Sequence, residues 1–230
     1  MNDLELTGRA RTHIEQLEEP RVALHREAVE PFLALRAAAA SAGLDVTPFS
    51  AFRDFEHQAQ IWNRKFRGER PLYDRDGVPR SHAGLTEAQL VEAILVWSAM
   101  PGASRHHWGS DIDVYDSAAM PEGYRVKLLP EEYVPGGVFE DLAAWLEENL
   151  HRFGFFRPYD QDRGGVYPEP WHISYAPVSA RAQAALSVDV IAGALRDADL
   201  LGKELVLERL PMIYRQYVAN VAMPPFGLVA

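Results

Sequence analysis

Apolar residues recur at helical spacing in several separate stretches of the chain. The stretch 23–42 is rich in Ala, Leu, Arg and Glu, and its apolar residues form an approximate helical stripe that ends before Gly43. Apolar faces also predict helices over 86–99 and 138–152, and a further helix is expected over 54–66. The pattern therefore predicts helices throughout the first two thirds of the chain.

Short stretches rich in β-branched and aromatic residues lie between these helices. They predict strands at 44–53, 111–115, the residues after Gly154, and 171–175. Pro48 places the first strand at a sheet edge or a bulge, because proline cannot donate a ladder hydrogen bond. The segments 67–85 and 116–137 are rich in Gly, Pro and charged residues and are predicted to be long surface excursions.

The last fifth of the chain differs from the rest. Residues 179–230 are helix-rich and contain no His or Trp, and they predict helices over 181–195 and 201–218, the second interrupted by Pro211. We interpret residues 1–178 as the main domain and the remainder as a helical C-terminal extension packed on it. The predicted fold is α+β, a small and mostly antiparallel sheet flanked by helices.

Composition excludes several classes of function. With 230 residues, 47% of them hydrophobic, the chain can bury a sizeable core in one domain. The formal charge of -10 argues against nucleic acid or an anionic membrane surface as the main partner. The chain has no cysteine, which excludes both a disulfide scaffold and a Cys-ligated metal.

The N-terminal stretch 1–19 is polar and charged and lacks the apolar centre of a signal peptide. No run of the sequence reaches the length needed to span a bilayer. The simplest prediction is a cytoplasmic protein with no membrane span, and export by another route or release by lysis stays open. The oligomeric state is not indicated by the sequence.

Two imidazoles and two carboxylates occur within residues 104–113. These ligand types suit a zinc ion. If a strand begins at Asp111, then Asp111 and Asp113 point to the same face. Two carboxylates that face one way are costly to bury unless a cation lies between them.

A turn at Gly109 brings the imidazoles of the same stretch near these carboxylates. Either His106 or His107 can coordinate a metal there, and Arg105 is the only strong base close by in sequence. The competing interpretation is a hydrated polar turn that leads into an edge strand. The stretch alone therefore indicates a functional site without fixing its ligands.

A second motif, Glu169-Pro170-Trp171-His172, offers one more imidazole and one more carboxylate. In a regular strand Glu169 and His172 would face opposite sides, but Pro168 and Pro170 disfavour a regular central strand. Glu169 can then lie on an irregular entry and converge with His172 on one site, while Trp171 points into the core. Taken alone this motif is weak, because Glu and His three residues apart often occur by chance.

Together the motifs resemble a known signature, in the order Ser104-x-His106-x-x-Gly109-x-x-x-Asp113 and Glu169-Pro170-Trp171-His172. It is that of the VanY-type D-alanyl-D-alanine carboxypeptidases, zinc peptidases that cut bacterial cell-wall peptides. Upstream, Ser50-Ala51-Phe52-Arg53 with Gln58 is similar to the family's Ser-Gly-Tyr-Arg stretch. The resemblance covers about residues 50–175.

The resemblance implies a zinc site with three ligands, His106, Asp113 and His172, and an open position for water. It implies Glu169 as the general base, which takes a proton from that water and later delivers it to the leaving amine. Arg53 corresponds to the family's arginine that faces the substrate carbonyl or carboxylate, where a guanidinium suits developing negative charge.

Other residues of the motifs have less defined roles. Ser104 and Gln58 are expected to contact the substrate or to support residues that do, and Trp108 is expected to line the substrate cleft. Asp111 departs from the family, which usually has a small residue there. It can compete with Asp113, hydrogen-bond a ligand or add negative charge near the substrate.

Histidines and tryptophans outside the motifs have a structural interpretation. The histidines are expected at the surface or in satisfied structural positions: His13, His25, His57, His82 and His151. The tryptophans at helical positions are expected in the core: Trp62, Trp97 and Trp145. Either long excursion can cap the cleft and select the substrate.

The functional prediction is a zinc-dependent carboxypeptidase domain over residues 1–178 that removes a terminal D-amino acid from peptidoglycan-type peptides. Alternatives are a phage-lysin-like peptidoglycan endopeptidase, and a non-catalytic zinc-bearing binding module on the same scaffold. Retention of both Glu169 and Arg53 argues against the binding module. The sequence leaves the choice between L,D and D,D bonds, and between exo- and endopeptidase action, open.

Overall fold

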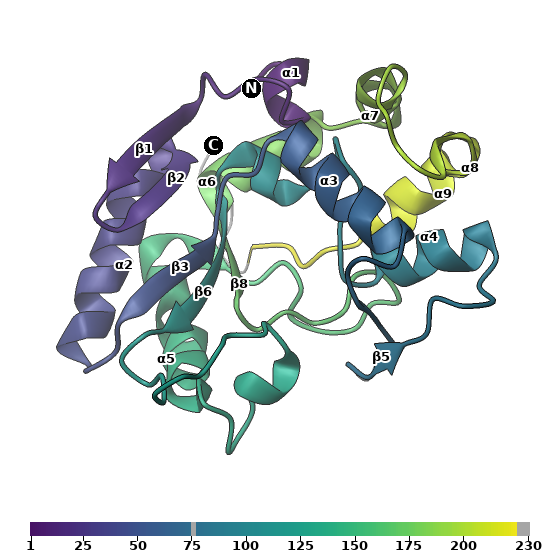
Figure 1. Cartoon of the computed structure of the whole chain (residues 1–230). Coiled ribbons are helices and arrows are strands. Elements are labelled where there is room, and N and C mark those ends of the chain that lie inside the picture. Colours follow the sequence, from purple (N-terminus) through teal and green to yellow (C-terminus); the bar gives the residue numbers. More distant parts are fainter. Residues whose placement is uncertain (75–76, 225–230) are drawn as a thin grey trace.

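A four-stranded antiparallel sheet lies at the centre of the fold, in a computed structural model that describes residues 1–74 and 77–224 (Figure 1). The strand order is β3-β6-β8-β7, with bounds Val46–Ser50, Asp111–Asp116, His172–Tyr175 and Phe155–Phe156. Helices flank this sheet on both sides (Figure 1). The predicted α+β fold with a small antiparallel sheet is confirmed.

Strand β3 forms one edge of the sheet and pairs only with β6 among the described strands. Its register with β6 shifts between Pro48 and Ser50. Pro48 therefore lies at both an edge and an irregularity, as its missing N–H requires. The shift occurs three residues before Arg53, where the chain leaves the sheet.

The helices agree with the predicted ones in order and differ at their ends. The α-helices are α1 Asp3–Leu6, α2 Val29–Ser41, α3 Phe55–Phe66, α4 Glu87–Leu95, α5 Glu140–Asn149, α6 Ala176–Ala185, α7 Val188–Leu195, α8 Lys203–Glu208 and α9 Leu210–Ile213. Short helical turns are η1 Arg26–Ala28, η2 Arg105–Trp108, η3 Pro130–Glu132, η4 Leu150–Phe153 and η5 Tyr214–Val218. The predicted helix over 181–195 is wrong as one element, because α6 and α7 meet at 81°.

Two hairpins were not predicted. Strands β1 Ile14–Glu18 and β2 Arg21–His25 pair antiparallel, as do the very short β4 Leu72–Tyr73 and β5 Pro79–Arg80. The first residues of the predicted helix 23–42 therefore belong to a strand. Their local helix propensity is overridden because Val22 and Leu24 bury their side chains in the same apolar cluster as α2.

The two faces of the central sheet differ in chemistry. On one face apolar residues pack into a cluster with α2 and α5: Ile112, Val114 and Ile173. The opposite face carries the polar residues Asp111, Asp113, His172 and Ser174, which alternate with them. Because the apolar face is buried, the polar residues are all directed to the other side of the sheet.

A second apolar cluster joins the helical half of the molecule. It combines side chains of α3 and α4 with those of α6 to α9. Trp62 of α3 is fully buried there and donates from Nε1 to the carbonyl of Leu201 at 3.0 Å. The C-terminal helices thus pack directly on α3, although a domain boundary at residue 178 stays a prediction.

No single helix within 1–74 and 77–224 is long and apolar enough to cross a bilayer. Helices α6 and α7 meet that requirement only when they are taken together across their bend.

Gly109 provides a test of how tightly the N-terminal hairpin packs on the sheet. Its φ is +66°, and an added Cβ would lie 2.4 Å from Ile14 Cδ1 and 2.6 Å from the backbone nitrogen of His25. Gly109→Ala is expected to lower the free energy of unfolding by about 2–5 kcal/mol, through left-handed strain plus overpacking. Urea denaturation measures this loss.

The matched control for that substitution is Gly43→Ala. Gly43 also has a positive φ, +85°, but an added Cβ would meet nothing within 4 Å. Only backbone strain of about 1–2 kcal/mol is expected there. Equal losses in the two variants would contradict the close contact between the hairpin and Gly109.

Candidate metal centre and active site

Three buried side chains from three elements converge beside the polar face of the sheet. His106 lies in η2, Asp113 in β6 and His172 in β8, and their ligand atoms all lie within 4.8 Å of one another. Asp113 and His172 are directly opposed in the β6–β8 ladder. Gly109 ends η2 in the left-handed conformation and turns the chain into β6. The structure thus brings together the three predicted ligands.

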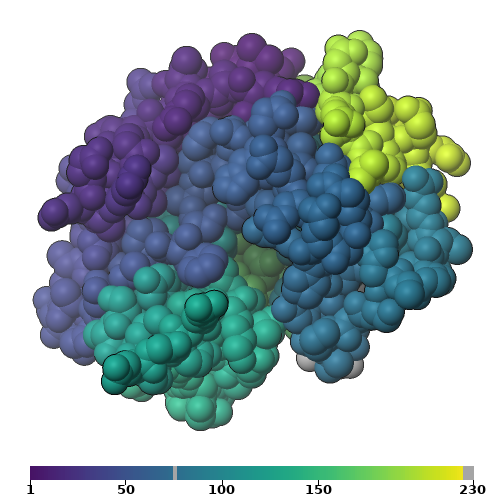
Figure 2. All heavy atoms as spheres, in the orientation of Figure 1, coloured from purple at the N-terminus to yellow at the C-terminus, as the bar shows by residue number. Residues whose placement is uncertain are grey.

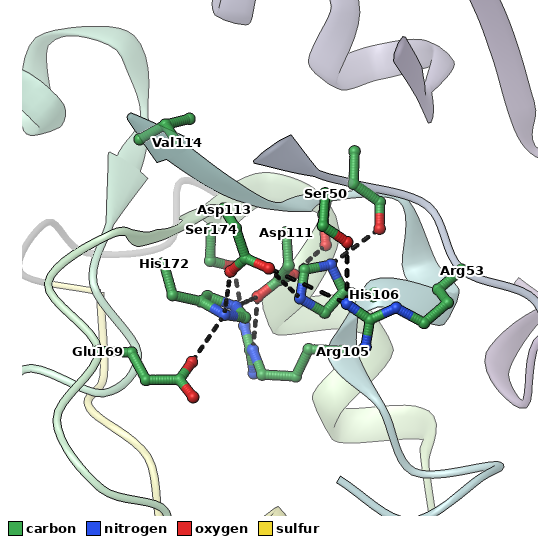
Figure 3. A network of polar contacts seen from close by, with 12 residues as sticks. Ser50, Arg53, Arg105, His106, Asp111, Asp113, Val114, Glu169, His172 and Ser174 are labelled. Carbon is green, nitrogen blue, oxygen red and sulfur yellow. Dashed lines mark hydrogen bonds and ion pairs between the residues drawn. The ribbon is translucent and has the colours of Figure 1, made fainter. Parts of the chain in front are cut away.

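The two imidazoles of this cluster are oriented by different nitrogens (Figure 3). Nδ1 of His106 lies 2.8 Å from the carbonyl oxygen of Ala51 and donates to it, which leaves Nε2 to face Asp113 Oδ2 at 3.3 Å. Nε2 of His172 lies 3.0 Å from Asp111 Oδ1, which leaves Nδ1 to face Asp113 Oδ1 at 3.2 Å. In its neutral form each ring would present an unprotonated nitrogen to the cluster.

Asp113 supplies the observation that tests for a metal. Its Oδ1 atom is buried and has no hydrogen-bond donor among the described residues. An unsatisfied buried carboxylate oxygen is costly, and a cation satisfies it. Two imidazole nitrogens and one carboxylate oxygen also form a ligand set that zinc takes in catalytic sites. The residues present therefore fit a zinc ion.

Asp111, which the sequence left unexplained, holds one of these ligands in place. It is fully buried and accepts from Arg105 Nε at 2.7 Å, Ser110 Oγ at 2.6 Å and His172 Nε2 at 3.0 Å. Burial raises the pKa of Asp111, but the Arg105 guanidinium and the hydrogen bonds outweigh it and hold the pKa below its usual range. Asp111 hydrogen-bonds a ligand rather than competing with Asp113.

His107 lies outside the cluster and has a structural role. Its Nδ1 donates to the carbonyl of Arg53 at 2.6 Å, and its Nε2 accepts from the backbone N–H of Gly102 at 3.0 Å. Burial lowers the pKa of His107 to about 3. Both ring nitrogens are occupied, so this histidine positions the backbone of Arg53.

The prediction that Trp108 lines the substrate cleft is wrong. Trp108 is fully buried in the cluster of the helical half, and its Nε1 donates to the carbonyl of Leu6 at 3.1 Å. The tight turn of η2 sends His106 and Trp108 in different directions. Trp97 is the opposite case. It was expected in the core, but it is half-buried and lines the cavity beside the candidate metal centre.

Glu169 converges with His172 as its irregular entry to the strand predicts. Its backbone N–H donates to the Tyr159 carbonyl at 3.0 Å, and its own carbonyl accepts from the N–H of His172 at 3.1 Å. This turn brings Glu169 Oε2 to 3.1 Å from His172 Nδ1. Trp171 between them is buried in the cluster beneath the sheet.

Arg53 lies on the other side of His106 from Glu169 (Figure 3). Its guanidinium donates to Gln58 Oε1 at 2.7 Å and to Ser50 Oγ at 2.8 Å, and it lies 4.0 Å from Asp113 Oδ2. Gln58 in turn donates from Nε2 to the carbonyl of Ala99 at 2.6 Å. Gln58 therefore supports Arg53 and does not itself line the cavity beside the candidate metal centre.

These side chains form the base of a cavity of about 260 Å³. Its lining includes Ser104 beside the groups already described, namely Arg53, His106, Asp113, Glu169 and His172. Figure 2 shows the surface hollowed between the blue and teal parts of the chain. The walls add Trp97 and residues that the sequence did not single out, among them Lys65, Arg70, Tyr73 and Tyr159.

One wall of the cavity comes from the excursion after β6 and is fastened by Glu132. This buried carboxylate accepts from the backbone N–H groups of Lys127 at 3.0 Å and Leu129 at 3.1 Å, and from the Tyr124 hydroxyl at 2.6 Å. Leu128 between the two N–H donors has a φ of +55°, unusual for a residue with a branched side chain. The wall is thus a fixed loop that holds Leu128 against the cavity.

Comparison with known proteins places the chain in a family. The family model described as VanY, D-alanyl-D-alanine carboxypeptidase, matches residues 21–178. The chain belongs to the VanY family. A Haemophilus influenzae protein, itself uncharacterized, is 37% identical over 118 residues, which cover 50% of this chain and 90% of that protein.

Two solved structures of VanY proteins share the fold. VanYB in complex with D-alanine-D-alanine has a TM-score of 0.52 and 24% identity, and the match covers 81% of this chain and 89% of that one. A variant of the vancomycin resistance D,D-pentapeptidase VanY in complex with Zn(II) has the same TM-score of 0.52 and 24% identity, covering 84% of this chain and 88% of that one. This likeness shows the fold.

The contact between Asp111 and His172 is open to a direct test. Asp111→Asn removes the charge that fixes the His172 ring, and zinc affinity is expected to fall about 10- to 100-fold. Competition with a chromogenic chelator measures the affinity. The control is Asp116→Asn, because Asp116 is a buried carboxylate of the same strand that accepts from Asp45 N and Ala118 N. Equal losses in both variants would indicate general weakening of β6.

Proposed function

We propose that this protein is a zinc-dependent D,D-carboxypeptidase that removes the terminal D-Ala from peptidoglycan-type peptides. The observation that carries the proposal is the buried His106, Asp113 and His172 cluster, with ligand atoms within 4.8 Å. Membership of the VanY family supports the D-alanyl-D-alanine substrate class. The Zn(II) complex of a VanY variant and the D-alanine-D-alanine complex of VanYB support the metal and the D,D bond.

The side chains of the cavity supply the steps of such a hydrolysis. His106, Asp113 and His172 would hold the zinc ion, which when bound would supply Lewis-acid chemistry to polarise a carbonyl and acidify water. Glu169 takes a proton from the attacking water on its carboxylate and delivers it to the leaving amine. Arg53 donates to the oxygen of the scissile carbonyl as negative charge develops on it.

The positions of Arg53 and Glu169 argue against a non-catalytic binding module. Each lies on its own side of the candidate metal centre, and both line the same cavity. Arg53 is held by Ser50 and Gln58, so its guanidinium is oriented before a substrate arrives. A site that only binds metal needs neither an oriented cation nor a carboxylate beside its ligands.

The proposal is tested by metal analysis and peptide digestion on one preparation. The substrates are a stem-type pentapeptide ending in D-Ala-D-Ala and a tetrapeptide ending in an L,D bond, and mass spectrometry records the products. We expect bound zinc and loss of one D-Ala from the pentapeptide. Cleavage of the tetrapeptide alone would replace the D,D assignment by L,D. Bound zinc with no cleavage would favour the binding module.

The role of Glu169 has its own test. Glu169→Gln keeps the size of the side chain but cannot accept the proton, so kcat is expected to fall about 10²- to 10⁴-fold with zinc content unchanged. Steady-state kinetics and metal analysis measure both. The control is Glu131→Gln, an exposed carboxylate that is absent from the cavity lining. A Glu169→Gln protein that binds zinc and cleaves at the wild-type rate would overturn the mechanism.

A further inference from the structure

The cavity carries more positive than negative side chains. Among the described residues its cations are Arg53, Lys65, Arg70, Arg105 and Lys127, and its carboxylates are Asp113 and Glu169. Arg105 is neutralised by Asp111 below it, and Lys127 is exposed to water. Lys65 and Arg70 are only partly exposed and form no ion pair with any described carboxylate.

Lys65 follows Gln58 and Ile61 along one face of α3, at a spacing of three and then four residues. Lys65 and Ile61 line the cavity, while Gln58 holds Arg53. The ammonium of Lys65 donates to Ser98 Oγ at 2.7 Å, and Gln58 donates to the carbonyl of the next residue, Ala99, at 2.6 Å. Lys65 and Gln58, which holds Arg53, therefore contact two adjacent residues of the chain.

The ammonium of Lys65 is partly buried, and the acceptor that it contacts, Ser98 Oγ, carries no charge. Burial is the main reason that the pKa of Lys65 is lowered to about 8, a shift that Glu169 opposes and that Arg70 and Arg53 reinforce. Lys65 lines the same cavity as Arg53 and Glu169. A partly desolvated ammonium with one neutral acceptor is unfavourable, and an anionic ligand offsets that cost.

We infer that Lys65, with Arg70 beside it, binds the C-terminal carboxylate of the amino acid that the enzyme releases. The inference rests on the proposed carboxypeptidase function and adds the group that selects a free chain end. One amino-acid residue spans about 3.5 Å and a hydrogen bond at each end adds about 3 Å, so one residue can bridge cations roughly 9–10 Å apart. Arg53 then meets the scissile carbonyl and Lys65 the carboxylate that follows it.

This assignment also decides between exo- and endopeptidase action. If the chain continues past the scissile bond, the position of the carboxylate is taken by a neutral amide. Lys65 and Arg70 would then stay buried by the substrate without a counter-charge, which is unfavourable. The two cations therefore favour a substrate that ends one residue after the bond that is cut.

The experiment compares two substrates that differ only at the chain end. One is a peptide ending in D-Ala-D-Ala with a free carboxylate, and the other is its C-terminal amide. The zinc-loaded wild type is expected to prefer the acid by roughly 10- to 100-fold in kcat/KM. Lys65→Met, close in length but uncharged, is expected to lose that preference through a higher KM for the acid, with activity on the amide retained.

Two further variants serve as controls. Lys65→Arg keeps the charge and is expected to keep most of the preference for the acid. Arg64→Met removes a charge from the neighbouring position of α3, where Arg64 is exposed and faces Glu69. It is expected to leave both substrates unaffected. A Lys65→Met enzyme that still prefers the acid as strongly as the wild type would overturn the inference.

Failure of the proposed function gives a different result. If the zinc-loaded wild type cleaves neither peptide, the carboxypeptidase assignment fails. Calorimetric binding of N-acetyl-D-Ala-D-Ala and of its amide then tests Lys65 by itself. Preferential binding of the acid that is lost in Lys65→Met supports the carboxylate site, and equal binding of acid and amide by the wild type overturns it.

Discussion

Antiparallel pairing of β6 with β8 fixes the register in which Asp113 lies opposite His172. That register is set from the other face of the sheet, where Ile112 and Ile173 are also paired and are fully buried. A slip of β8 by one residue would turn Ile173 to the polar side and His172 into the core. The apolar packing with α2 and α5 therefore determines the geometry of the polar site.

Burial of several charges in one place requires that each have a defined counterpart. Arg105 meets Asp111 and also donates to Ser174 Oγ at 2.8 Å, so one guanidinium ties β6 to β8 from behind the candidate ligands. Asp111 then orients His172, and the Ala51 carbonyl orients His106. What remains unmatched is Asp113 Oδ1, at the point where the ligand atoms converge. Protein groups thus orient the side chains around the centre, and Asp113 Oδ1 is left for a cation.

The sequence predicted the sheet and the order of the helices, because the periodicity of apolar residues is a local property. The three residues that converge were predicted from the resemblance to the VanY family, since local spacing alone left His106 and His107 as alternatives. It did not predict β1 and β2, since their pairing overrides local helix propensity. It misplaced Trp108 because neighbouring residues of a tight turn point in different directions, which no pattern of residue types records. Lys65 was not singled out, and Trp97 was expected in the core, because their roles depend on a cavity formed by segments far apart in the chain.

Glu132 affects the entropy cost of binding a peptide in the cavity. One buried carboxylate fixes the backbone on both sides of Leu128, so the wall of the cavity is held by contacts within the protein itself. A peptide that enters need not order this loop, and the entropy of ordering it is lost during folding instead. The wall thus works as a rigid template rather than as a closing lid. Selectivity for peptide shape is then set by steric fit at the moment of encounter.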